Sequence, residues 1–139
     1  MKPTPVCFLI DDDLDDQEIF LLAWKQVDPS IECIYANDGI YGLEKLHRES
    51  LTPNLIFIDI NMPRMSGIDV LIEVKKIRRL QKVPVYMYST AADPAIIMEC
   101  KRLGAEDFIK KAPTMSELEH ALANILSNYK LSLSNYKLS

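Results

Sequence analysis

The sequence predicts an α/β fold in which a parallel β-sheet is covered by helices on both faces. Two observations predict it: short apolar runs typical of strands buried on both faces, and longer segments in which apolar residues recur with helical spacing. These alternate, strand then helix, five times, which requires right-handed crossovers between parallel strands. With 139 residues, 48% of them hydrophobic, the chain is long enough for one domain with an ordinary core.

The strand candidates are short apolar runs bounded by residues that interrupt regular structure. In chain order they are Val6–Ile10, Ile31–Ala36, Leu55–Ile58, Val83–Tyr88 and Glu106–Lys110. Pro53 and Pro63 enclose the third run, so Asp59 is expected at or just past the carboxyl end of a core strand. Pro84 interrupts the fourth near its start, and the more polar fifth is expected at a sheet edge.

The helices are predicted from apolar faces and from capping residues. In chain order, the faces are Phe20, Ala23 and Val27; Ile40, Leu43 and Leu46; Val70, Val74 and Ile77; and Leu118, Ala121, Leu122 and Ile125. Capping boxes at Ser66–Asp69 and Thr114–Glu117 begin the third and the last helix. Asp93 caps the fourth helix, Pro94 takes its first position, and Gly104 ends it.

Unusual polar residues gather where the predicted strands end. Asp11 and Asp12 follow the first strand, Asp59 the third, Ser89 the fourth, and Lys110-Lys111 the fifth. Open parallel sheets bind their ligands at the carboxyl ends of the strands, where the strand order reverses. We therefore expect these side chains to lie around one site.

Three of these residues, Asp11, Asp12 and Asp59, offer carboxylates without a histidine or thiolate beside them. Hard oxygen ligands of this kind select Mg²⁺, Mn²⁺ or Ca²⁺ over Zn²⁺. Without a cation the carboxylates would repel and raise one another's pKa, whereas Mg²⁺ and one lysine would neutralise them. A metal, a lysine and a hydroxyl around one carboxylate form a clamp for phosphoryl oxygens, with the carboxylate as nucleophile.

Other reactive side chains are expected to have structural roles. Asp13, Asp15 and Asp16 are interpreted as caps and solvated charge at the start of the first helix. The three cysteines lack metal-ligand spacing and are expected to be reduced core thiols of a cytosolic protein; they are Cys7, Cys33 and Cys100. Trp24 is expected to pack in the core.

The chain resembles the receiver domain of the two-component response-regulator family, from about Val6 to about Ile125. The residues that carry the resemblance are Asp11-Asp12, Asp59–Pro63 with Ser66-Gly67, Ser89 five residues after Pro84, and Lys111 seven residues after Gly104. Each motif alone is weak, but together, in this order and at this spacing, they are highly specific. The resemblance implies a flavodoxin-like sheet of five parallel strands in the order 2-1-3-4-5, with five helices on both faces.

The resemblance also implies how the acidic site works. Asp59 would be the phosphoacceptor, taking a phosphoryl group from a histidine kinase or a histidine phosphotransfer protein. Asp12, Asp59 and the main-chain carbonyl of Asn61 would bind Mg²⁺ directly, and Asp11 would assist through water. Mn²⁺ is expected to be able to replace Mg²⁺.

The remaining residues of the motif would stabilise and report the phosphoryl group. Lys111 would pair with Asp59 and then with the phosphoryl group, and Ser89 would donate its hydroxyl, with Thr90 as second choice. Phe108 occupies the aromatic switch position of the family. The sequence departs from the family at Ala112, which stands between Lys111 and the proline that usually follows the lysine directly, so the loop is either strained or rebuilt.

The resemblance implies a stand-alone signalling module with output by protein contact. We expect a receiver domain over residues 1–125 and a tail or helix extension over residues 126–139, in which a heptapeptide is exactly duplicated. The output surface would be the fourth helix, fifth strand and fifth helix around Phe108, with relay to another histidine or a phosphorylation-dependent homodimer as further options.

The tail is too short for a DNA-binding domain, the net charge of −4 disfavours nonspecific nucleic-acid binding, and a cytoplasmic protein without a membrane span is expected.

Three other functions fit parts of the same pattern. A magnesium-dependent phosphohydrolase with an aspartyl nucleophile needs a second acid two residues after the nucleophile, where this chain has Asn61. A flavin-binding module needs a hydroxyl- and glycine-rich phosphate loop where this chain has five aspartates between residues 11 and 16. A degenerate receiver used only for docking would not need the acids, the hydroxyl and the lysine together.

Overall fold

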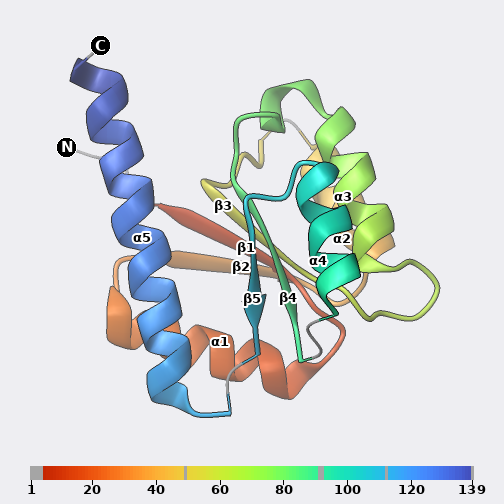
Figure 1. Ribbon diagram of the computed structural model, residues 1–139, viewed down its shortest axis with the longest axis horizontal. Helices are drawn as coiled ribbons and strands as arrows, with labels where there is room; N and C mark the ends of the chain where they lie inside the picture. The colour runs from red at the N-terminus through yellow and green to blue at the C-terminus, as the bar shows by residue number, and fades with distance from the viewer. Residues whose placement is uncertain (1–4, 49, 91–92, 112, 139) are drawn as a thin grey trace.

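The protein folds around a parallel sheet of five strands in the order β2-β1-β3-β4-β5 (Figure 1). The structure is a computed structural model, and it describes residues 5–48, 50–90, 93–111 and 113–138. The strands are β1 (Val6–Ile10), β2 (Glu32–Ala36), β3 (Leu55–Asp59), β4 (Val85–Ser89) and β5 (Asp107–Lys110). The predicted flavodoxin-like sheet and its order are therefore confirmed.

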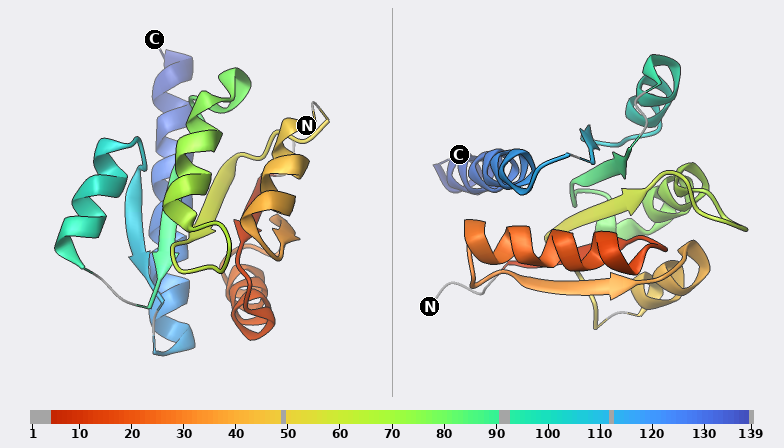
Figure 2. Two further views of the ribbon diagram at one scale, coloured as in Figure 1. Left: turned by 90° about the vertical axis from the view of Figure 1, so that its right-hand side faces the viewer. Right: turned by 90° about the horizontal axis from the view of Figure 1, so that it is seen from below.

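Helices cover both faces of this sheet, as predicted. They are α1 (Leu14–Val27), α2 (Gly39–His47), α3 (Gly67–Lys76), α4 (Pro94–Arg102) and α5 (Met115–Leu138), with a short 3₁₀ helix η1 (Arg78–Leu80) after α3. α1 and α5 pack on one face, and α2, α3 and α4 pack on the other (Figure 2). Among the described residues, no helix combines the length and the apolar character that crossing a membrane would require.

β1 has its predicted boundaries, and the other four strands differ from the predicted ones by one or two residues at one or both ends. β4 begins at Val85 because Pro84 has no N–H to donate, although its carbonyl still accepts a hydrogen bond from the Ile56 amide at 3.1 Å. β4 also includes Ser89, which was predicted to follow the strand and instead pairs in register with Lys110. The Ser89 side chain is therefore placed by the sheet and not by a loop.

The helix caps are close to their predicted positions. Side-chain oxygens of Asp13, Ser66 and Asp93 accept hydrogen bonds from amides in the first turns of α1, α3 and α4. Thr114 likewise accepts a hydrogen bond from the Glu117 amide at the start of α5.

One apolar face differs from the periodicity prediction, at the start of α2. Ile40, expected on the apolar face of α2, is 52% exposed. The other predicted residues of this face, Leu43 and Leu46, pack in the core. In α1, Val27 is half-buried and packs against the core as predicted, and Trp24, 1% exposed, packs with Phe20 and Phe57.

Helix α5 continues through the duplicated heptapeptide and projects past the sheet (Figure 1). In the first copy, Leu126 is buried and the Tyr129 hydroxyl accepts a hydrogen bond from Asn54 Nδ2 at 2.9 Å. Leu131 and Leu133 are 58% and 45% exposed. The helix therefore leaves the body of the protein within the duplicated segment, and the division into residues 1–125 and 126–139 stays a prediction.

Candidate functional site

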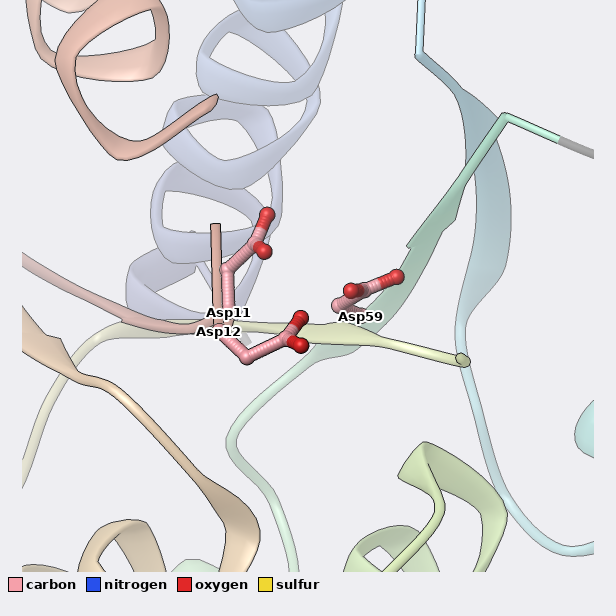
Figure 3. A group of neighbouring side chains, drawn as sticks. All are labelled: Asp11, Asp12 and Asp59. Atoms are coloured by element: carbon pink, nitrogen blue, oxygen red, sulfur yellow. The ribbon is translucent and has the colours of Figure 1, made fainter. Parts of the chain in front are cut away.

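The site lies at the carboxyl ends of β1 and β3, which are neighbours in the sheet. Asp11 directly follows β1, where its amide donates a hydrogen bond to the Ala36 carbonyl at 3.1 Å, and Asp59 is the last residue of β3. The side chains of Asp11, Asp12 and Asp59 lie around a common space (Figure 3). One carboxylate oxygen of each lies within 4.8 Å of the others.

Burial makes this arrangement of acids electrostatically unfavourable. Asp11 is fully buried and Asp59 is 5% exposed, whereas Asp12 is exposed. Burial raises the pKa of Asp59 to about 7; the Asp11 charge acts in the same direction, and Lys111 opposes it. Burial also raises the pKa of Asp11. Asp59 and Asp11 therefore bind protons more tightly than a solvated aspartate does, and a bound cation would favour their ionised forms.

Three hard oxygen donors within reach of one point are a suitable ligand set for Mg²⁺ or Mn²⁺. Carboxylates are the donors these cations prefer, and exposed Asp12 leaves one side of the site open, so that a cation would keep some of its waters. The raised pKa of Asp59 is consistent with this, because burial and the Asp11 charge outweigh the single positive charge of Lys111 nearby. The residues present thus fit the expected metal.

Lys111 supplies positive charge from the other side of the site. Its amide donates a hydrogen bond to the Ser89 carbonyl at 2.8 Å, which fixes the backbone beyond the end of β5. Its Nζ lies 3.0 Å from Asp11 Oδ2 and 3.7 Å from Asp59 Oδ2. It also lies 5.1 Å from the centroid of the Tyr88 ring. Lys110, the alternative lysine, is exposed at the end of the edge strand.

The shortest ion pair of Lys111 is with Asp16, which the sequence predicts to be a cap or a solvated charge at the start of the first helix. Asp16 Oδ2 lies 2.7 Å from Lys111 Nζ, so the interpretation of Asp16 as solvated charge is wrong. The Lys111 side chain, which follows β5, thus contacts the first turn of α1 across 95 positions of sequence. Burial alone would lower the pKa of Lys111, but hydrogen bonds with Asp16 and Asp11 outweigh burial and raise it.

The hydroxyl and amide groups lie on the β4 side of Asp59. Ser89 is 1% exposed, and its Oγ accepts a hydrogen bond from Asn61 Nδ2 at 3.3 Å. The main-chain N–H of Asn61 donates a hydrogen bond to Asp59 Oδ1 at 3.4 Å. Thr90, the second choice for the hydroxyl, is exposed. Ala112, at which the sequence departs from the family pattern, lies outside the described residues.

The connection from β3 to α3 depends on a close approach of backbone segments. The Gly67 amide donates to the Ile60 carbonyl at 2.8 Å. A Cβ at position 67 would overlap the Asp59 carbonyl oxygen and lie 2.7 Å from the Ile60 Cα. Glycine is therefore required here, because any side chain would push the end of β3 away from its position beside Asp11.

Phe108 lies on the edge strand β5, away from the acids. It is half-buried and packs against the core under α2, α3 and α4. It also lines an open pocket of about 480 Å³ between β5 and the start of α5, with Lys110, Pro113, Glu117 and other residues. The role of Phe108 as an aromatic switch stays a prediction.

The chain is similar to known proteins over most of its length. The family model of the response regulator receiver domain matches residues 7–123. Protein-glutamate methylesterase/protein-glutamine glutaminase 2 of Koribacter versatilis (strain Ellin345) is 32% identical over 134 residues, covering 94% of this chain and 36% of that protein. The two-component response regulator ARR17 of Arabidopsis thaliana is 31% identical over 128 residues, covering 85% of this chain and 82% of that protein.

The solved structures agree with the sequence relatives. The Mn(2+)-bound form of response regulator Rcp1 aligns with a TM-score of 0.77 at 25% identity, covering 88% of this chain and 92% of that chain. The chain spans only about a third of the length of the methylesterase relative. Its similarity to that enzyme therefore concerns one part of the enzyme.

Proposed function

The chain belongs to the response regulator receiver domain family of two-component signalling, and from this premise we propose that Asp59 accepts a phosphoryl group in a Mg²⁺-dependent reaction. The donor is the phosphohistidine of a histidine kinase or of a histidine phosphotransfer protein. The observation that carries the proposal is the group of three carboxylates, with oxygens within 4.8 Å of one another, beside the Lys111 ammonium.

The metal would be held by Asp12, Asp59 and the Asn61 carbonyl, with Asp11 contributing through water. When bound, the cation supplies charge neutralisation for the carboxylates and for the incoming phosphoryl oxygens. The Mn(2+)-bound form of the similar response regulator Rcp1 supports a divalent cation here, and with it the expected substitution of Mn²⁺ for Mg²⁺.

The transfer itself uses the side chains of this chain. The Asp59 carboxylate oxygen attacks phosphorus, the new O–P bond forms as the P–N bond to the donor histidine breaks, and the imidazole leaves with the bonding electrons. Lys111, 3.7 Å from Asp59 in the unphosphorylated protein, neutralises charge on the phosphoryl oxygens. Ser89 exchanges its contact with Asn61 for a hydrogen bond to one of these oxygens.

The output is contact with another protein at the face formed by α4, β5 and α5. Movement of Ser89 toward the phosphoryl group draws the end of β4 inward, and Phe108 on the adjacent strand follows it out of the pocket beside α5. The same phosphorylated state allows two alternative outputs. One is transfer of the phosphoryl group to a second histidine, and the other is phosphorylation-dependent dimerisation of this chain. In this proposal the chain catalyses only its own phosphorylation and dephosphorylation.

The test is incubation with acetyl phosphate and Mg²⁺, followed by intact-mass measurement. We expect one added phosphoryl group on the wild type, none with EDTA, and none on Asp59→Asn. Asp69→Asn, which changes an exposed acid of α3, is the matched control and should label like the wild type. Equal labelling of Asp59→Asn would overturn the proposal, absence of labelling would favour a docking-only receiver, and continuous hydrolysis of acetyl phosphate would favour a phosphohydrolase.

A further inference from the structure

Two cysteines lie side by side in neighbouring strands. Cys7 of β1 and Cys33 of β2 are direct register partners. Both side chains lie on the face covered by α1 and α5, where Cys7 is part of the core and Cys33 packs against it. Neighbouring strands are about 4.8 Å apart, which lies within the range of about 4.4–6.8 Å for the Cα atoms of disulfide-bonded cysteines. The spacing of the two Cα atoms is therefore compatible with a disulfide between the strands.

The two thiols differ in exposure. Cys7 is 1% exposed, whereas Cys33 is half-buried on β2, an edge strand of the sheet. The Cys7 thiol, acting as hydrogen-bond donor, lowers the pKa of Cys33, and burial raises the pKa of Cys7. A partly exposed thiol with a lowered pKa beside a second thiol is the arrangement that oxidants attack selectively.

The surroundings of the pair are polar for a protein core. The Trp24 Nε1 and the Tyr35 hydroxyl are both buried without a hydrogen-bond partner among the described residues. Both residues belong to or pack against the same core cluster as the two cysteines. Burial raises the pKa of Cys7 and the Trp24 indole opposes this, whereas Tyr35 adds to the lowering of the pKa of Cys33 that the Cys7 thiol causes. These groups can stabilise negative charge on sulfur, which an apolar pocket would not.

We propose that Cys7 and Cys33 form a reversible oxidation site, in which a peroxide converts the two thiols to a disulfide between β1 and β2. The Cys33 thiol releases its proton, and the thiolate attacks a peroxide oxygen. The O–O bond breaks, Cys33 becomes a sulfenic acid, and the hydroxide or alkoxide takes up the released proton and leaves as water or an alcohol. The Cys7 sulfur then attacks Cys33 Sγ, the S–O bond breaks, and water leaves with the Cys7 proton. The two thiols lose two electrons and the peroxide gains them; an external dithiol reverses the change.

The third cysteine is a built-in control. Cys100 lies in α4, on the opposite face of the sheet, and is buried in the other core cluster. Burial raises its pKa, and the sheet separates it from both Cys7 and Cys33. Oxidation should therefore leave Cys100 a thiol, and this expectation does not depend on the phosphoacceptor function.

The experiment treats the full-length chain with hydrogen peroxide and maps its peptides with and without dithiothreitol. We expect the loss of two hydrogens per chain, a peptide cross-linked between Cys7 and Cys33, and a fall in Trp24 fluorescence, because a disulfide beside an indole quenches it. Dithiothreitol should reverse all three changes. Peptide mapping of the wild type tests the proposal even if a variant fails to fold.

Variants separate this site from general thiol oxidation. Cys33→Ser and Cys33→Ala should lose both the cross-link and the fluorescence change, whereas Cys100→Ser should keep both. A cross-link that includes Cys100, disulfides only between two chains, or oxygen addition without loss of two hydrogens would each overturn the proposal.

Discussion

Replacing Asp59 with asparagine should stabilise the metal-free protein at neutral and alkaline pH. Asparagine has the shape of a protonated aspartate but has no charge to be buried beside Asp11 and Asp12. Burial first, and then the Asp11 charge, raise the pKa of Asp59 to about 7 in the native protein. The unfolded chain has the ordinary aspartate pKa of about 3.9.

The sign of the effect follows from these two values. Between about pH 4 and pH 7 the native protein holds a proton on Asp59 that the unfolded chain has released, so the unfolding free energy of the wild type falls as the pH rises through this window. The difference of about three pH units corresponds to about 4 kcal/mol once both states are ionised. That is a large part of the roughly 5–15 kcal/mol by which small domains are stable.

The assay is urea unfolding in EDTA between pH 4.5 and pH 8. We expect Asp59→Asn and the wild type to agree within about 1 kcal/mol at the acid end, and the variant to be more stable by several kcal/mol at pH 8. Glu44→Gln, an exposed acid of α2, is the control and should differ from the wild type by about the same small amount at every pH. A constant difference between Asp59→Asn and the wild type across the range would refute the reasoning, and so would a less stable variant at pH 8.

Three further substitutions test other contacts. Asp16→Asn frees Lys111 to approach the phosphoacceptor, so labelling by acetyl phosphate should accelerate about fivefold, the equivalent of about 1 kcal/mol; an unchanged mass time course would contradict this. Gly67→Ala should lower the unfolding free energy by about 1–3 kcal/mol in urea titrations, since the backbone must move to admit the Cβ. An unfolding free energy equal to that of the wild type would show that the loop between β3 and α3 accommodates the methyl group. Tyr129→Phe removes the hydroxyl that accepts from Asn54 and should lower the unfolding free energy by about 1 kcal/mol, and no loss would mean that α5 is not docked there.

Most of the fold could be predicted because buried parallel strands can be recognised in the sequence as apolar runs. The run from Leu55 to Ile58 ends in a carboxylate, and β3 ends at that carboxylate. The boundaries of β4 were harder to predict, because hydrophobicity does not show which main-chain amides form hydrogen bonds with the neighbouring strands. Ser89 is polar and yet pairs with Lys110 in the sheet, and only the register reveals this.

The acidic site could be predicted because the topology itself brings it together. In a parallel sheet every carboxyl strand end lies at the same edge, so Asp11, Asp59 and Lys111 meet without any knowledge of helix packing. The neighbouring pair Cys7 and Cys33 could not be found this way. It depends on the register of β1 against β2, and a slip of one residue would place the two thiols on opposite faces.

Asp16 was missed for a different reason, and it changes the charge balance of the site. Three carboxylates, one lysine and one Mg²⁺ would be neutral, but the 2.7 Å contact with Lys111 brings in a fourth carboxylate. Lys111 is thus shared between Asp16, Asp11 and Asp59, and its contact with Asp59 is the longest of the three. A phosphoryl group on Asp59 would bring further negative charge to the same ammonium and so compete with Asp16 for it. Phosphorylation would then change contacts not only at Ser89 and β4 but also at the first turn of α1, because the ion pair between Lys111 and Asp16 connects that turn to the end of β5.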